Sequence, residues 1–167
     1  QSGVKNIVVS SPHCYHTFKN EYPALGGNFA VGHFTQYLWG LIEGGKLELT
    51  KELNKKVAYQ DPCYLGRHNG IYDEPRQVLS SIPGLELVEM ADNRENGLCC
   101  GGGGGRIWME TPKGERFADI RLEQAIEAGA EVLAVACPYC MLNFEDSVLT
   151  ENKADVIEVR DISELVW

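Results

Sequence analysis

The stretch Val132-Leu133-Ala134-Val135-Ala136-Cys137-Pro138-Tyr139-Cys140 joins a run of apolar residues directly to a pair of cysteines. A short apolar run of this kind is typical of a buried strand, and the residues up to about Val148 favour a helix after it. The C-x-x-C turn between them lets two thiolates point at one centre, which suits zinc, an iron–sulfur cluster or a thiol redox pair. The rest of the chain either repeats or completes this strand, turn and helix.

Strands and helices are expected to alternate along the chain. The expected strands lie at residues 6–10, 29–33, 57–60, 85–90, 132–136 and 156–159, and the expected helices at about 15–22, 34–42, 71–82, 113–128 and 138–148. This alternation predicts an α/β fold with a largely parallel sheet, in which sites gather at the carboxyl ends of the strands.

Two of the expected helices carry apolar residues at helical spacing. In the first these are Phe34, Tyr37, Leu38, Leu41 and Ile42, and in the second they are Phe117, Ile120, Ala125 and Ile126. Residues at this spacing share one side of a helix, so we expect both sets to face the core.

The composition is that of a globular domain. The 167 residues are 44% hydrophobic and 23% charged, which is enough to bury a core without disulfides. The net charge of −9 gives nucleic-acid binding little support. No run of about eighteen apolar residues and no export signal occurs, so we expect a cytoplasmic protein that does not itself span a membrane.

The two ends of the chain resemble each other. Ser11-Pro12-His13-Cys14 matches Cys137-Pro138-Tyr139-Cys140, each after a short apolar run, and residues 33–39 match residues 161–167 after a two-residue offset. Each end would then consist of a strand, a cysteine turn, a helix, a strand and a helix, which indicates an internal repeat.

This repeat divides the chain into unequal parts. We expect residues 1–45 to be the C-terminal half of a first repeat, residues 46–56 to be a polar connector, and residues 57–167 to be a complete second repeat. On this interpretation the chain is a fragment that begins midway through the first repeat, and Trp167 is an artificial end.

Five of the six cysteines form an ordered pattern. Cys63 is followed after 35 residues by Cys99-Cys100, and Cys137 and Cys140 follow after a similar gap. Adjacent cysteines are a poor disulfide pair, and the five glycines after them supply backbone that can approach whatever the sulfurs hold. Zinc or an ordinary cubane cluster uses four thiolates, so five suit a cluster with bridging sulfurs, or a four-ligand site beside a reactive cysteine.

Three motifs carry a more specific resemblance. They are Asp61-Pro62-Cys63-Tyr64-Leu65-Gly66-Arg67, the segment from Cys99 to Arg106, and Cys137-Pro138-Tyr139-Cys140. Together they resemble the CCG, or cysteine-rich, domain of heterodisulfide reductase B/D-type subunits and related iron–sulfur oxidoreductases. The resemblance implies a non-cubane [4Fe-4S] cluster held by Cys63, Cys99, Cys100, Cys137 and Cys140. Residues 19–23 and 33–36 are most similar to the membrane-linked members that accompany electron-transfer flavoproteins.

The resemblance also implies an activity. The chain would belong to an oxidoreductase that transfers electrons between a flavoprotein or iron–sulfur donor and a disulfide or quinone acceptor, within a larger protein or complex. Docking onto a membrane subunit at the cytoplasmic face fits this role. No residue is assigned a catalytic step.

The residues alone leave two alternatives open. One is a structural zinc module for protein assembly, which would need only four of the five cysteines and would give Cys99-Cys100 no role as a pair. The other is a metal-free thiol redox protein that uses Cys137 and Cys140.

The first cysteine turn departs from the pattern, because Ser11 stands where the leading cysteine would be. We therefore expect Cys14 to be a plain buried cysteine, with a ligand role elsewhere or an outer position beside the second site as alternatives. Other polar residues have both a functional interpretation, as proton carriers or as partners of an anionic cluster, and an ordinary surface one. These are His13, His16, His33, His68, Arg67 and Arg106.

Overall fold

The computed structural model describes residues 3–112 and 114–167. Its main sheet has four parallel strands in the order β4-β3-β5-β6. The strands are β3 (Lys56–Tyr59), β4 (Glu86–Val88), β5 (Val132–Val135) and β6 (Glu158–Asp161). The helices that connect or follow them are α3 (Asp73–Ser80), α4 (Phe117–Glu127), α5 (Pro138–Thr150) and α6 (Ile162–Leu165).

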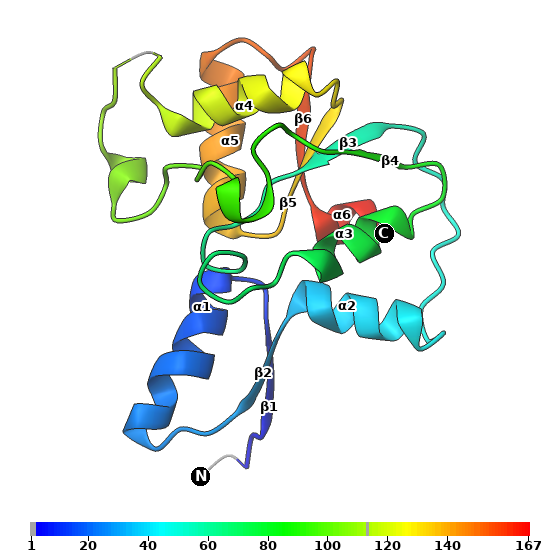
Figure 1. Ribbon diagram of the computed structural model, residues 1–167, viewed down its shortest axis with the longest axis vertical. Helices are drawn as coiled ribbons and strands as arrows, with labels where there is room; N and C mark the ends of the chain where they lie inside the picture. The colour runs from blue at the N-terminus through cyan, green and yellow to red at the C-terminus, as the bar shows by residue number, and fades with distance from the viewer. Residues whose placement is uncertain (1–2, 113) are drawn as a thin grey trace.

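The main sheet lies between two layers of helices, with α4 and α5 on one face and α3 and α6 on the other (Figure 1). Successive residues of a strand point to opposite faces, so the central strands feed both layers. Ala58, Leu133 and Val135 pack in the core with α4 and α5. Val57, Tyr59, Val132 and Ala134 pack in the core with α3 and α6. A strand buried on both faces explains the unbroken apolar run of β5.

A second, two-stranded parallel sheet lies apart from the main one (Figure 1). It consists of β1 (Asn6–Val9) and β2 (Ala30–His33). Between them run α1 (Pro12–His16), a π-helical segment (Thr17–Glu21) and a 3-10 turn (Tyr22–Leu25). The helix α2 (Phe34–Glu43) follows β2 and packs against α3 of the main unit. Through α2 the small sheet is joined to the core of the larger one.

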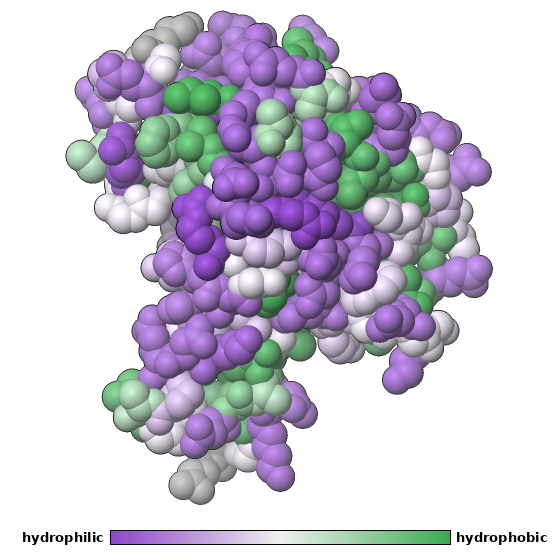
Figure 2. Space-filling model, in the orientation of Figure 1, coloured by the Kyte–Doolittle hydropathy of each residue, from purple (hydrophilic) through white to green (hydrophobic). Residues whose placement is uncertain are grey.

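The small sheet keeps part of its apolar surface in contact with solvent. Hydrophobic side chains show on the lobe that carries β1, β2 and α1 in Figure 2, below a hydrophilic band across the middle of the view. Val4 and Val8 are each about half exposed. The small core beneath α1 is built from Tyr15, Leu65 and Ile71. The main sheet therefore holds the larger part of the buried core.

The predicted α/β architecture with parallel strands is confirmed. Several boundaries differ from those expected. The strand β6 begins two residues later, and α1 begins at Pro12, which occupies the first helical turn. Proline is favoured there because its missing N–H would have no helical partner. The start predicted for one helix at Lys113 lies outside the described residues, and α4 begins at Phe117.

Both predictions of a buried helical face were partly wrong. In α2, Tyr37 is 55% exposed, and Trp39 packs against the core together with Phe34, Leu38 and Ile42. In α4, Phe117 and Ile120 are exposed and the buried face instead carries Arg121. A guanidinium can be buried there only because polar partners accept its hydrogen bonds. Among the described residues no helix is both long and apolar enough to cross a membrane.

Candidate cysteine centre

The five cysteines of the sequence pattern line a single cavity of about 150 Å³. Cys63 follows β3 and Cys137 follows β5, so the carboxyl ends of two neighbouring parallel strands deliver these thiols to one edge of the sheet. The loop after β4 brings Cys99 and Cys100 to the same place. Cys140 lies one helical turn after Cys137, and the other lining residues are Pro12, His13, Pro62, Tyr64, Gly103, Gly104 and Tyr139.

Cys137 and Cys140 are held by the start of a helix. Cys137 is the N-cap of α5 and Pro138 is its first residue. A hydrogen bond from Cys140 lowers the pKa of Cys137, and backbone N–H groups of the first turn, from Tyr139 and Cys140, act in the same direction. Thiolates are generally stabilised at helix N-termini by such N–H groups and by the helix dipole. Cys137 is therefore favoured as an anionic ligand.

The paired cysteines link the other thiols into one chain of contacts. The Sγ atoms of Cys99 and Cys63 are 4.0 Å apart. Hydrogen bonds from Cys100 and Cys63 lower the pKa of Cys99, while the bond with Cys99 and burial raise the pKa of Cys63. Hydrogen bonds to Cys100 and Cys137, together with burial, raise the pKa of Cys140. The contacts thus run from Cys63 through all five sulfurs to Cys137.

The glycines after the pair bring backbone close to sulfur. The backbone N–H of Gly101 donates to Cys99 Sγ at 3.4 Å. Gly101 has a φ of 79°, and a Cβ there would lie 3.0 Å from Phe117 Cβ, so a larger residue would strain this turn. Backbone N–H groups aimed at sulfur stabilise its negative charge.

This arrangement fits a polynuclear centre better than a single ion. Five thiols from three segments share one cavity, and three of them, Cys100, Cys137 and Cys140, are at most 4% exposed. Soft thiolates are the ligands typical of iron–sulfur clusters.

Comparison with known proteins agrees with this geometry. The family model of the cysteine-rich domain, CCG, matches residues 57–145, which contain all five of these cysteines. The chain belongs to the CCG cysteine-rich domain family. The matched segment begins in β3 and ends within α5, so it covers all five cysteines of the cavity and most of the main sheet.

Individual relatives are similar over nearly the whole chain. The chain is 42% identical to "Probable iron-sulfur-binding oxidoreductase FadF" of Bacillus subtilis and 40% identical to "EtfAB:quinone oxidoreductase" of Syntrophomonas wolfei, in each case over 99% of its length and 24% of the relative's. It is 38% identical to one subunit of the dihydromethanophenazine:CoB–CoM heterodisulfide reductase of Methanosarcina barkeri, over 99% of this chain and 41% of that protein. The chain thus spans between a quarter and two fifths of these relatives.

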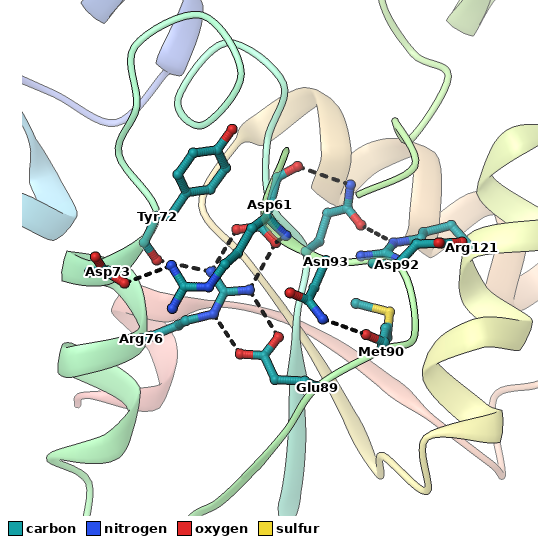
Figure 3. Close-up of polar contacts among 11 residues, drawn as sticks. Asp61, Tyr72, Asp73, Arg76, Glu89, Met90, Asp92, Asn93 and Arg121 are labelled. Carbon is teal, nitrogen blue, oxygen red and sulfur yellow. Dashed lines mark hydrogen bonds and ion pairs between the residues drawn. The ribbon is translucent and has the colours of Figure 1, made fainter. Parts of the chain in front are cut away.

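An ion-pair network around the buried side chains of Arg76 and Asp61 lies beside the first cysteine of the CCG domain, and Figure 3 shows its contacts. Arg76 donates to both carboxylate oxygens of Asp61, at 2.7 and 2.9 Å, and to both of Glu89, at 2.6 and 2.9 Å. Asp61 Oδ2 also accepts the backbone N–H of Arg94 at 2.7 Å. Since Asp61 is two residues from Cys63, this network ties the Cys63 turn to α3 and to the segment after β4.

A second network fixes the backbone before the cysteine pair. Arg121 Nε donates to Gln60 Oε1 at 2.7 Å, and Gln60 Nε2 donates to the carbonyl of Leu98 at 3.0 Å. Figure 3 shows Arg121 reaching this region from α4. The side chain of Asn143, on α5, donates to the carbonyl of Cys100, and Arg116 donates to Asn143 Oδ1 at 3.0 Å. Polar side chains thus hold the carbonyls on either side of Cys99.

The other candidate residues have different surroundings. The expectation that Cys14 is buried was wrong: it is exposed, whereas the buried residues of α1 are Pro12 and Tyr15. Of the four histidines only His13 lines the thiol cavity. Arg67 donates to the carbonyl of Gly97 at 2.8 Å, and its charge contributes to lowering the pKa of Cys99, behind the thiol and backbone hydrogen bonds. Arg106 instead lines a neighbouring cavity of about 220 Å³ that also contacts Cys100.

Sequence reasoning missed the supporting polar residues. Gln60, Arg121 and Asn143 are each at most 4% exposed, yet no spacing in the sequence links them to the cysteines. Asp61 stands beside Pro62-Cys63 in the motif, which was the one available signal for its role.

Proposed function

We propose that Cys63, Cys99, Cys100, Cys137 and Cys140 hold one non-cubane [4Fe-4S] cluster. The observation that carries this proposal is the single cavity lined by five thiols from three segments. A conventional cubane would use four of them, whereas a cluster with bridging thiolates uses all five. The names of the relatives, which include an iron-sulfur-binding oxidoreductase, support iron and sulfide as the occupants.

The protein's own residues have defined tasks at such a centre. When bound, the cluster supplies one-electron transfer. The N–H of Gly101 and the positive charge of Arg67 stabilise the thiolate of Cys99. The start of α5 stabilises Cys137, and the networks of Arg76 and Arg121 hold the turns that carry Cys63 and Cys99. Rigid ligands keep the reorganisation of the site small when charge is added.

The proposed role in the whole protein is electron transfer from a flavoprotein or iron–sulfur donor to a disulfide or quinone. The relatives named for a quinone oxidoreductase and for a heterodisulfide reductase support these two acceptor classes. A relative named as a membrane-anchored ferredoxin, from Chromohalobacter salexigens, supports docking at a membrane, for which the cytoplasmic face is the proposed side. The activity is thus one of a larger protein or complex.

The proposed domain boundaries follow from the repeat. Residues 57–167 are the complete cluster-binding repeat, residues 46–56 the connector, and the described residues before 46 belong to a first repeat. The order β1, α1, β2, α2 parallels β5, α5, β6, α6, and each strand pair is parallel. The helices α2 and α6 both begin with a capping box, at His33 and Asp161. This shared capping box supports the interpretation that the segment from β1 to α2 and the segment from β5 to α6 are copies of one repeat.

Metal and sulfide analysis tests the cluster. The full-length protein is purified without oxygen, and its iron, zinc and acid-labile sulfide are measured together with its electron paramagnetic resonance spectrum. We expect the Cys100→Ser variant to contain about four irons and four sulfides fewer per chain than the wild type. Stoichiometric zinc without sulfide, persisting after reconstitution with iron and sulfide, would contradict the proposal and favour the structural zinc module. Reduction by a flavoprotein, followed by oxidation with either a quinone or a disulfide, then identifies the acceptor class.

A further inference from the structure

His13 reaches the thiol cavity from outside the segment that carries the five cysteines. It lies on α1, in the turn that matches the Cys137 turn, and its imidazole is one of the cavity walls. Its ring centroid is 4.1 Å from that of Tyr64 and 5.2 Å from that of Tyr139. These tyrosines follow Cys63 and lie between Cys137 and Cys140, so His13 is inserted between two of the cysteine motifs.

The imidazole has unused hydrogen-bonding capacity. Its Nδ1 atom is buried and has no hydrogen-bond partner within the described residues. A buried polar atom without a partner is unfavourable, and such atoms are uncommon in folded proteins. Sulfur is the acceptor chemistry that the cavity offers to this imidazole, since five thiols line the same cavity as His13.

The position of His13 is fixed by contacts of the rest of α1. Tyr15 is 2% exposed and packs with Leu65 and Ile71. Asn20 Nδ2 donates to Asn69 Oδ1 at 2.9 Å, which joins the end of the π-helical segment to the loop after Cys63. The imidazole is therefore held at the cavity by the docking of the first segment onto the second.

We propose that His13 is a positioning residue that donates a hydrogen bond to the sulfur shell of the centre and so raises its reduction potential. This inference rests on the proposed cluster. An electron added to a cluster increases the negative charge on its sulfurs, so an N–H donor stabilises the reduced form more than the oxidised form. The first segment of the chain thereby contributes to the electronics of a centre whose ligands all lie in the second.

His68 offers a matched control for this proposal. Its ring stacks on Tyr64 with a centroid distance of 4.5 Å and an interplanar angle of 31°, against 4.1 Å and 33° for His13. His68 is exposed and does not line the cavity. The variants H13F and H68F therefore remove an imidazole from the same tyrosine while keeping an aromatic ring, but only H13F removes a donor from the cavity.

The experiment is a redox titration of the full-length protein and its variants, followed by electron paramagnetic resonance, with iron and sulfide measured in each sample. We expect H13F to retain the cluster with a more negative midpoint potential and altered g-values, and H68F to match the wild type. The variants H13Q and H13N each restore an N–H donor, on side chains of different length. We expect the midpoint potential of at least one of them to lie between those of H13F and the wild type.

Three outcomes would overturn the inference. They are an unchanged potential in H13F, an equal shift in H68F, and loss of iron from H13F, H13Q and H13N alike, which would make the residue a requirement for assembly instead. Absence of iron and sulfide from the wild type would contradict the proposed function itself, and so is distinguishable from failure of the role of His13.

Discussion

The turns Ser11–Cys14 and Cys137–Cys140 have the same secondary structure on either side but differ in the burial of their cysteines. Each follows a parallel strand and starts a helix with proline in the first turn. Cys137 and Cys140 are 2% and 3% exposed and face three other thiols, whereas Cys14 is exposed. The comparison teaches that the turn alone does not create the site. The segment after β3 and the loop after β4 supply the remaining thiols, and β1 has only β2 beside it in the described chain.

The largest expected effect separates the five thiols of the cavity from Cys14. Replacing Cys100 by serine is expected to abolish the cluster, because it removes the sulfur that joins Cys99 to Cys140 in the chain of contacts. Replacing Cys14 by serine is expected to leave the iron and sulfide content unchanged. Both are measured on anaerobically purified full-length protein. Equal losses of iron and sulfide in the two variants would contradict the difference proposed between Cys100 and Cys14.

The next effect concerns the ion-pair network beside Cys63, which is one of the thiols that the first turn lacks as a neighbour. Arg76→Met leaves the 5% exposed Asp61 without its guanidinium partner, and removal of one member of a buried ion pair costs about 3–5 kcal/mol of folding free energy. The control is Arg160→Met, whose pair with Glu158 is exposed and contributes less than about 1 kcal/mol. Urea denaturation of the metal-free protein compares the two variants. Similar losses would show that the Asp61 network does not support the Cys63 turn.

A smaller effect concerns His33, the N-cap of α2, and it depends on pH. Burial lowers the pKa of His33 from 6.5 to about 4, against opposing hydrogen bonds to the carbonyls of Ser10 and Ala136. The unfolded state therefore binds a proton at His33 more tightly than the folded state does. The contribution of neutral His33 to the free energy of unfolding is fully present above pH 6.5 and is lost as the pH falls towards 4. His33→Asn, which keeps a neutral cap, is expected to remove about 2 kcal/mol of the stability difference between about pH 7 and about pH 5. An identical pH dependence in the variant would contradict this assignment.

The smallest effect tests the corresponding cap in the second segment. Asp161 accepts the backbone N–H of Ser163 at 2.9 Å, and Glu164 accepts the backbone N–H of Asp161 at 2.8 Å. Asp161→Ala is expected to cost about 1 kcal/mol of unfolding free energy, since one helical N–H loses its acceptor. Ser163→Ala, which keeps the carboxylate cap, is the control. If only Ser163→Ala lowered the free energy of unfolding, the assignment of Asp161 as the cap would be wrong.

The sequence predicted the fold class well because strand and helix signals alternate and β5 is a clear apolar run. It predicted helical faces less well, since periodicity assigns apolar residues to the core and cannot show that Arg121 finds partners there. It misplaced Cys14 for a related reason: the burial typical of free cysteine is an average, and the exposure of one thiol depends on which elements pack beside its helix.

The sequence predicted which cysteines lie together, but not the polar side chains that hold the backbone beside them. Motifs carry Cys63, Cys99-Cys100 and the Cys137 turn, and the carboxyl ends of parallel strands explain why they meet. The roles of Gln60 and Asn143 depend on hydrogen bonds between segments far apart in the chain. The approach of His13 depends on how the first segment docks, which a local pattern does not encode.

The central claim is that five thiols bind one centre and Cys14 does not. Its most direct test is alkylation of the cluster-loaded and the metal-free full-length protein without oxygen, with each cysteine quantified by mass spectrometry. Cys63 and Cys99 are the informative reporters, because both are partly exposed. The account predicts that loading protects Cys63 and Cys99 strongly and leaves the labelling of Cys14 unchanged. Equal labelling of Cys63 or Cys99 in both states, or protection of Cys14, would contradict it.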